Sequence, residues 1–207
     1  MQDLIKAEEL REFPKFWRWF QDNSEVLKRI RSADAPEYNE LQRRVARLSP
    51  EIEAEIGGFT SKDDLNLVFN AHGDRRYFSL IDEIVKSAPH MDGWCVRALK
   101  PPLLENLRVQ YGDQEITTQE IWLKVGSGQD TESRLQLIVA IQHENDANQN
   151  WSRESAALLA IESFLGERVY SLSMFIDGFV DLPNNPRAEG FVSLWDIANQ
   201  LQLSGLE

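Results

Sequence analysis

Apolar residues at helical spacing mark the beginning of the chain. In "EFPKFWRWFQDN", four aromatic residues stand at the offsets i, i+3, i+4 and i+7, namely Phe13, Phe16, Trp17 and Phe20. This period predicts an amphipathic helix with Pro14 in its first turn, where proline is tolerated. A docking face or a base-stacking platform would show the same stripe. Since helical spacing is also what core packing produces, we expect the stripe to lie in the core.

The pattern changes near residue 50. A second helix is predicted from Glu37 to about Leu48, because apolar residues repeat there with the same period and Pro50 discourages continuation. The stretch "EIEAEIGGF" then alternates apolar residues with glutamates, which favours a half-buried strand, with a continued helix as the alternative. We therefore expect an N-terminal helical segment, residues 1–50, packed on an α+β domain of residues 51–207 in a single compact unit.

Strand and helix patterns alternate through the rest of the chain. The predicted elements are a strand at 65–71, a helix at 75–88, a strand at 93–100, a hairpin region at 107–125, a strand at 134–142, a helix at 152–165, a strand at 171–181 and a short C-terminal helix. Without the hairpin the order is βαββαβ, which commonly forms a mostly antiparallel sheet with both helices on one face. The predicted fold class is therefore α+β and ferredoxin-like, with an inserted hairpin and preceding N-terminal helices.

Composition indicates a globular protein of the cytoplasm. The 207 residues are 42% hydrophobic and include six Trp and ten Phe, which is ample for a core. No apolar run is long enough to span a membrane, and the N-terminus lacks the pattern of a secretory signal. The single cysteine, Cys95, cannot form an internal disulfide. We expect a cytoplasmic protein without a membrane partner.

Charge argues against nucleic acid as a partner. The net charge is −12, and residues 51–207 hold twenty-five acidic residues against twelve basic ones. Most of the chain would repel a polyanion at long range. A basic cluster, Arg43, Arg44 and Arg47, has helical spacing beside acidic residues, which is typical of a solvated helix face rather than an anion site.

Four short blocks together carry a family resemblance: "FWRWF", "LVFNAHG", "APHMDGW" and "LKPP". As a set they resemble a family of uncharacterised bacterial proteins, a domain of unknown function in which an aromatic N-terminal helix precedes an α+β body. The resemblance covers about residues 13–181. It implies a bacterial origin, and it implies no activity that would transfer to residues of this chain.

The first candidate site is "AHGD", residues 71–74, which follows a predicted strand. Gly73 can supply a positive φ for a turn, and the Asp74 carboxylate can accept N–H groups of the next helix. This structural interpretation is favoured, and it leaves His72 as a partly exposed loop residue. A catalytic role would instead require His72 and Asp74 to converge in a cleft.

Metal and cofactor chemistry find little support in the sequence. The ligand candidates are His72, Asp74, His90, His143, Glu144 and Asp146, and none has the spacing of H-E-x-x-H. In a ferredoxin-like sheet, His72 and His143 would lie at opposite ends, about 20 Å apart. Cys95 is expected to pack as a small hydrophobic residue in a strand. The stretch "VGSG" at 125–128 is interpreted as a hairpin turn rather than a phosphate-binding loop. No metal and no cofactor are expected.

Two functional hypotheses follow. The first is a non-enzymatic protein that binds another protein through an acidic face, as an inhibitor, immunity or regulatory factor would. The alternative is a hydrolase or small-molecule-binding protein with a site around His143, Glu144 and Asp146, or around His72 and Asp74. An enzyme should bring such residues together in a cleft, whereas a binding module should show an exposed patch and scattered histidines. The oligomeric state does not follow from the sequence.

Overall fold

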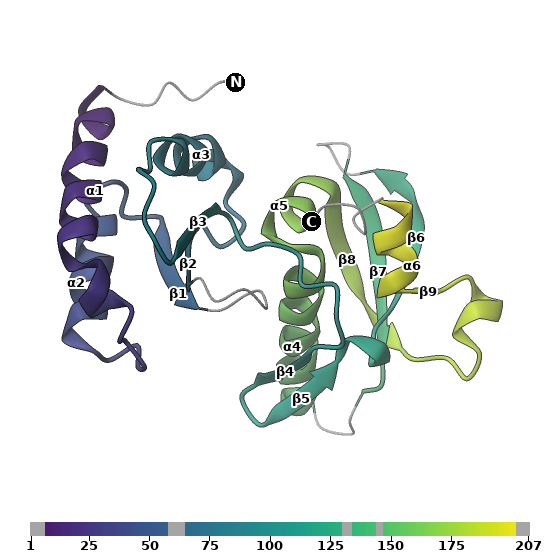
Figure 1. The fold of residues 1–207 in the computed structure, drawn as a ribbon. Coiled ribbons are helices and arrows are strands. Elements are labelled where there is room, and N and C mark those ends of the chain that lie inside the picture. The colour runs from purple at the N-terminus through teal and green to yellow at the C-terminus, as the bar shows by residue number, and fades with distance from the viewer. Residues whose placement is uncertain (1–6, 58–64, 130–133, 144–146, 202–207) are drawn as a thin grey trace. The chain divides into compact units, whose positions relative to one another are not determined.

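The computed structural model describes residues 7–57, 65–129, 134–143 and 147–201, which fold as an α+β protein (Figure 1). The chain divides into two compact units, Met1–Lys100 and Pro101–Glu207, called unit 1 and unit 2 below. The division between the units lies at residue 100, and the helices predicted within residues 1–50 belong to unit 1. The physical reason is that the N-terminal helices and the first sheet share one hydrophobic core.

Unit 1 is built on a three-stranded sheet. Its elements are α1 (Ala7–Leu27), α2 (Pro36–Val45), β1 (Glu53–Gly57), β2 (Leu65–Asn70), the 3-10 turn η1 (Arg75–Tyr77), α3 (Phe78–Lys86) and β3 (Trp94–Ala98). The strand order is β1-β2-β3, with β1 antiparallel to β2 and β3 parallel to it. The predicted strand in "EIEAEI" is confirmed as β1, because Ala54 is buried and the glutamates alternate with it.

The aromatic stripe of α1 is buried, as predicted. Phe16 and Trp17 pack against Phe69 of β2, with ring centroids 5.7 and 5.9 Å apart. The expected position of Pro14 in a first helical turn is wrong, since α1 begins at Ala7 and the proline lies inside it. The helix therefore lacks the hydrogen bond that an N–H at this position would donate to the carbonyl of Leu10.

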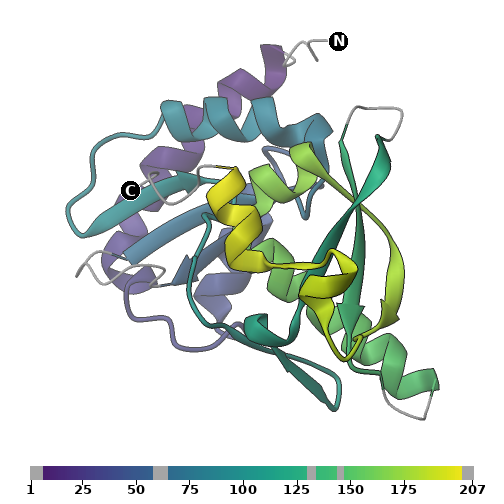
Figure 2. The ribbon, with the colours of Figure 1, turned by 90° about the vertical axis from the view of Figure 1, so that its right-hand side faces the viewer.

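Unit 2 contains a hairpin and a four-stranded sheet. Its elements are β4 (Arg108–Tyr111), β5 (Gln114–Thr117), η2 (Thr118–Glu120), β6 (Trp122–Gln129), β7 (Leu135–Ile141), α4 (Ala147–Leu165), α5 (Glu167–Ser173), β8 (Met174–Asp181), η3 (Pro186–Glu189), β9 (Val192–Ser193) and α6 (Leu194–Gln200). The sheet order is β8-β7-β6-β9, and β7 is parallel to β8 only. Helix α4 lies to the left of this sheet in Figure 1 and behind its strands in Figure 2.

The ferredoxin-like order is not confirmed. The strands at 65–70 and 135–141, expected as neighbours in one sheet, belong to different units. Each is instead flanked by the strand before it in the sequence and by the strand that follows its helical crossover. The hairpin turn expected at "VGSG" is also wrong, since β6 continues through it to Gln129 with a register shift. Glycines suit such an irregular strand.

The two units repeat one topology. In each, an antiparallel strand pair is followed by a helical crossover and a strand parallel to the central one, as β1-β2-α3-β3 and as β6-β7-α4-α5-β8. The central strands begin with Leu-Asn-Leu and Leu-Gln-Leu, and a histidine stands two residues beyond each strand. His72 and His143 therefore occupy matching positions at the carboxyl ends of two parallel strand pairs.

Candidate functional site

In sheets with parallel strands, ligands and catalytic side chains gather at the carboxyl ends of the strands. The described residues form two such edges. One lies where β2 and β3 end in unit 1, and the other where β7 and β8 end in unit 2. Each edge carries one of the histidines that the sequence singled out.

At the edge of unit 2, His143 lies between two carboxylates. Its Nδ1 is 2.8 Å from Oδ1 of Asp181, the last residue of β8, and its Nε2 is 3.1 Å from Oε1 of Glu154 on α4. The imidazole is 16% exposed. A neutral ring has one N–H and can donate to only one of these carboxylates, whereas an imidazolium donates to both. Both contacts are therefore hydrogen bonds only when the ring carries two protons.

Among the described residues, both ring nitrogens of His143 are occupied by carboxylate contacts. A general base needs a ring nitrogen directed at its substrate, and both nitrogens of His143 face carboxylates. The carboxylates lie on different sides of the ring, so they do not converge on one ion. Within the described part of the chain, no group of three or more His, Cys, Asp or Glu residues is placed to hold a metal. The two contacts connect His143, two residues beyond β7, to the end of β8 and to α4.

Sequence reasoning identified only part of this cluster. His143 was a candidate, but its companions Glu144 and Asp146 lie outside the described residues. Asp181 and Glu154 were missed. The sequence did contain a signal for Asp181. The strand before His143 is connected by a helix to the strand that ends at Asp181. Strands connected in this way usually pair in parallel, so their carboxyl ends lie side by side.

At the edge of unit 1, two residues have unusual backbone conformations. His72 has φ of +50° and Leu99 has φ of +66°, and each follows the end of a parallel strand. Positive φ is uncommon for residues other than glycine and gathers at functional sites. The His72 Nε2 lies 3.2 Å from Glu53 Oε2 of β1. Both side chains are mostly exposed, so this pair contributes little to stability.

Asp74 acts as the predicted cap. Its carboxylate accepts the backbone N–H of Arg76 at 3.1 Å and the Nε–H of the same residue at 2.9 Å. The hydrogen bond from the Arg76 side chain holds the pKa of Asp74 below its ordinary value. Gly73 has φ of +82°, as the turn requires. The structural interpretation of "AHGD" is confirmed for Asp74 and Gly73.

A second polar group at this edge was not foreseen. Glu55 Oε1 of β1 accepts hydrogen bonds from Asn70 Nδ2 at 3.1 Å and from Lys100 Nζ at 2.9 Å. Asn70 is fully buried, and its Oδ1 has no hydrogen-bond partner. Glu55 also lines a pocket of about 450 Å³. In the sequence, Glu55 looked like one of several solvated glutamates, because the pairing that brings Asn70 beside it was not visible.

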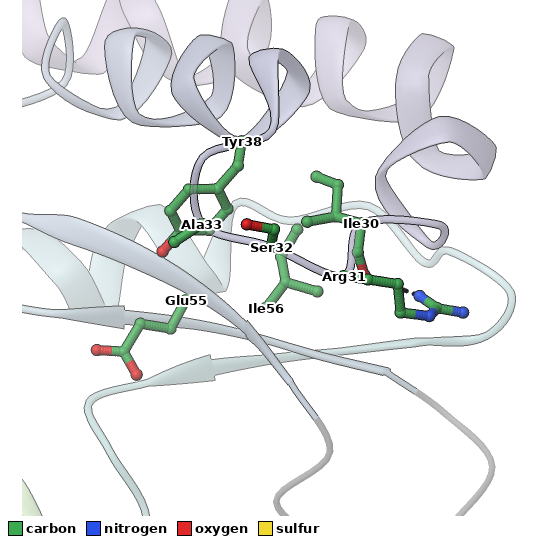
Figure 3. A pocket seen from close by; sticks show the side chains of 7 residues that line it. All are labelled: Ile30, Arg31, Ser32, Ala33, Tyr38, Glu55 and Ile56. Atoms are coloured by element: carbon green, nitrogen blue, oxygen red, sulfur yellow. Dashed lines mark hydrogen bonds between the residues drawn. The ribbon is translucent and has the colours of Figure 1, made fainter.

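That pocket lies between the α1–α2 loop and β1 (Figure 3). Its lining residues are Ile30, Arg31, Ser32, Ala33, Tyr38, Glu55 and Ile56. None of the sequence-predicted site residues is among them. The histidines His72 and His143 are thus scattered over two units, and neither lines this pocket.

One face of the sheet of unit 2 packs against α4, and on the other face Ala140 is also buried. Along β7, Leu137, Val139 and Ile141 belong to the core with α4, so the residues between them point to the other side. The strand register sets Trp122, Ala140 and Val180 in one row and Lys124, Ile138 and Gly178 in the next. Phe175 stands beside Gln136. Val180 and Phe175 are 40% and 39% exposed.

Cations surround this apolar centre. Arg187 lies over the ring of Trp122 at 5.6 Å and Arg134 over that of Phe175 at 5.4 Å. Lys124 lies 5.5 Å from the ring of Phe191. We call the set the outer sheet face; it consists of Trp122, Lys124, Arg134, Ile138, Phe175, Val180 and Arg187.

The outer sheet face differs in charge from the rest of unit 2. Residues 101–207 hold sixteen acidic and six basic residues, a net charge of −10. Three of those six basic residues are Lys124, Arg134 and Arg187. Arg187 is paired with Asp196 at 3.3 Å, so its charge is already balanced in part, whereas Lys124 has no ion-pair partner among the described carboxylates.

Comparison of the chain with protein-family models, with curated proteins and with solved structures gave no match. Among the described helices, none combines the length and the apolar character needed to cross a membrane. The function is therefore inferred from the geometry.

Proposed function

We propose that the protein binds another protein through the outer sheet face of unit 2, and that its partner presents apolar side chains flanked by carboxylates. The observation that carries this proposal is the exposed pair Phe175 and Val180 within a rim of three cations. In this proposal the protein acts in the bacterial cytoplasm as an inhibitor, immunity or regulatory factor.

Exposed apolar side chains support an interaction role for unit 2. Of the nine large apolar residues that the described part of the chain exposes, eight belong to this unit. Single exposed apolar residues are ordinary, but a contiguous patch with a polar rim is typical of a binding surface. On the outer sheet face the two exposed apolar residues, Phe175 and Val180, both belong to β8, and the register sets partly buried Trp122 and Ile138 on the neighbouring strands.

Charge complementarity selects the partner. A cationic rim favours carboxylates on the opposing surface and disfavours basic partners. A polyanion such as nucleic acid is a poor fit, because the net charge of −10 on unit 2 repels it at long range. A protein segment with a few acidic residues around an apolar centre meets both conditions.

The same features favour binding over hydrolysis. His72 and His143 lie in different units, and each imidazole is paired with a carboxylate. The pocket lined by Glu55 contains neither histidine. An exposed patch together with scattered histidines is the pattern expected of a binding module.

A photo-crosslinking amino acid placed at Phe175 tests the proposal in the producing cell. The matched control is Leu159 of α4, which is 41% exposed but does not belong to the outer sheet face. We expect Phe175 to give crosslinks that Leu159 does not, to peptides with Asp or Glu around apolar residues. Equal crosslinking at both positions, or crosslinks to nucleic acid, would contradict the proposal.

The crosslinked segment, prepared as a peptide, then tests the role of charge. We expect its affinity to fall with rising salt, and Lys124→Glu to weaken it by about tenfold. The control is Arg108→Glu, which changes the net charge equally on the β4–β5 hairpin. An unchanged affinity for the Lys124 variant, or an equal loss in both variants, counts against the outer sheet face.

A further inference from the structure

We propose that two copies of this chain pair through β8, antiparallel and around a two-fold axis, so that their unit 2 sheets join into one. Strand β8 is the outermost strand of its sheet, and β7 pairs with it on one side. Among the described strands, none pairs with the other side of β8. Unpaired backbone groups along such an edge are a template for a further strand. The proposal concerns this edge and goes beyond the function proposed for the outer sheet face.

The two exposed apolar side chains of β8 stand at symmetric positions in the strand. Phe175 is its second residue and Val180 its last but one, and they are 39% and 40% exposed. The register shift between β7 and β8 leaves Asp177 without a partner on β7. This bulge is the reason that Phe175 and Val180 point to the same face, since residues five positions apart in a regular strand point to opposite faces.

This symmetry makes β8 complementary to a second copy of itself. When two β8 strands run antiparallel over their full length, Phe175 of each copy lies opposite Val180 of the other. An aromatic ring opposite a β-branched side chain is a favourable cross-strand pair. In the same register Ile176 lies opposite Phe179, and both of these side chains point to the core side of the sheet. Apolar residues are therefore matched on both faces of the joined sheet.

Asp177 stands at the centre of this pairing and is the group that opposes it. It lies opposite Gly178 of the second copy, where a Cβ would have no atom within 4 Å, so the carboxylate has room to turn to solvent. The two Asp177 carboxylates and the net charge of −12 on each chain still repel each other. Because salt screens this repulsion, we expect added salt to strengthen the pairing.

The pairing is closed and small. A two-fold contact uses the same surface of both copies, so it ends at two chains and does not continue into a fibre. It joins one strand edge to another rather than two broad faces, which places it below the standard interface size of about 1,200 to 2,000 Å². We therefore expect a reversible dimer with a Kd of roughly 1 to 100 µM.

Sedimentation equilibrium of the full chain, from about 1 to about 500 µM, tests the proposal. We expect a monomer–dimer equilibrium that shifts towards the dimer when NaCl rises from about 50 to about 500 mM. This salt dependence is opposite to the one expected for the partner of the outer sheet face, so the two proposals are tested separately. A monomer at every concentration and salt would overturn the dimer and leave the proposed function unaffected.

Val180→Glu connects the dimer to β8. It replaces an apolar cross-strand partner with a charge, so dimerisation should weaken at least about tenfold. Leu159→Glu on α4 is the charge-matched control, because Leu159 is 41% exposed and does not belong to β8. An equal loss in both variants, or an unchanged dimer in the Val180 variant, contradicts the proposal.

A mixed sample of labelled and unlabelled unaltered chains tests the register without any substitution. Within one copy, Phe175 and Val180 stand beside Gln136 and Ala140 of β7, so they are separated by about 13 Å at 3.3 Å per residue. We expect intermolecular NOEs between the Phe175 ring and the Val180 methyl groups. Intermolecular NOEs confined to residues outside β8 would show that the copies meet elsewhere and would overturn the proposal.

Discussion

Trp17 joins three elements of unit 1 through one side chain. Its ring packs against Phe69 of β2, and its Nε1–H donates to the Ile84 carbonyl at 3.2 Å and to Ser87 Oγ at 2.9 Å. We expect Trp17→Ala to lower the free energy of unfolding by about 3 to 5 kcal/mol, since a large ring and a buried hydrogen bond are lost together. Urea denaturation followed by circular dichroism measures this change.

Trp19 is the control on the same helix. It lies off the stripe, is partly exposed and carries Arg44 over its ring at 5.1 Å. Trp19→Ala should cost no more than about 2 kcal/mol, because less apolar area is buried there. A loss below about 1 kcal/mol for Trp17→Ala would mean that α1 contributes little to the core.

Asp74 provides a pH-dependent prediction at the scale of one residue. The Arg76 side chain lowers its pKa from the ordinary 3.8, so its contribution to stability is present above that value and is lost as pH falls through the lowered pKa. Asp74→Ala should cost about 0.5 to 2 kcal/mol at pH 7, and His72→Ala almost nothing. Asp74→Asn should keep the cap and lose the pH dependence. Thermal melts between pH 2 and pH 7 separate these cases, and equal costs for His72→Ala and Asp74→Ala would contradict the cap.

The two histidine motifs show which residue contacts a sequence reveals. The cap formed by Asp74 was predictable because donor and acceptor stand two residues apart in a turn whose geometry Gly73 sets. The contacts of His143 were not, since Asp181 follows it by 38 residues and approaches only when β7 and β8 pair. Contacts between residues close in the sequence can be predicted from it, whereas contacts that depend on strand pairing cannot.

At the scale of elements, hydrophobic periodicity identified α1, β1, α3, β7 and α4 close to their observed positions. It did not identify which strands pair. The strands at 65–70 and 135–141 are similarly apolar, so either would suit the centre of one large sheet. In the structure, the helical connection after each of these strands leads to a strand that pairs with it directly, as β3 pairs with β2 and β8 with β7. The exposure of Phe175 and Val180 could not be predicted either, because it depends on which strands lie beside β8.

Glu120 links the short turn η2 to α4. Its carboxylate accepts the Thr117 backbone N–H and hydroxyl, both at 2.7 Å, and receives Arg153 Nη2 at 2.9 Å. Burial raises the pKa of Glu120, but the hydrogen bonds from Thr117 and Arg153 outweigh burial and leave it below its ordinary 4.5. The contacts of the ionised Glu120 carboxylate therefore stabilise unit 2 fully above pH 4.5, and this stabilisation is lost as pH falls through the lowered pKa of Glu120.

Glu120→Gln should lower the free energy of unfolding by about 1 to 3 kcal/mol at pH 7, because Arg153 is buried and loses its charged partner. The difference from the unaltered protein should shrink as pH falls below 4.5. Glu115→Gln is the control, since Glu115 pairs with Arg108 on the surface and should cost less than about 1 kcal/mol. Denaturant titrations at pH 7 and pH 3.5 provide the comparison, and a pH-independent difference would contradict the assigned role.

At the scale of the whole molecule, charge is divided unequally. Unit 1 holds eighteen acidic and sixteen basic residues, whereas unit 2 holds sixteen and six. We expect no binding to duplex DNA at physiological salt, since net repulsion opposes the phosphate contacts that supply most non-specific affinity. Fluorescence anisotropy with a labelled duplex measures it. Sub-micromolar, salt-sensitive binding would contradict this and direct attention to Arg43, Arg44 and Arg47, although Arg43 and Arg44 already pair with Glu40.

The division of the chain at residue 100 gives the last prediction. Residues 1–50 contribute the stripe of α1 and Leu41 and Val45 of α2 to the core of unit 1, so a chain that begins at Glu51 would expose the other half of that core. Unit 2 has a core of its own, centred on β7 and α4.

We therefore expect residues 101–207 to fold alone, with a cooperative thermal transition and dispersed amide resonances. In the chain that begins at Glu51, the amides of β1, β2 and β3 should lack that dispersion, because Phe69 loses the aromatic side chains of α1 that pack against it. Two-dimensional NMR spectra of both chains measure the dispersion of the amide resonances of each unit separately. Dispersed resonances for β2 in the shortened chain would show that α1 and α2 are an added arm, and would restore the boundary at residue 50.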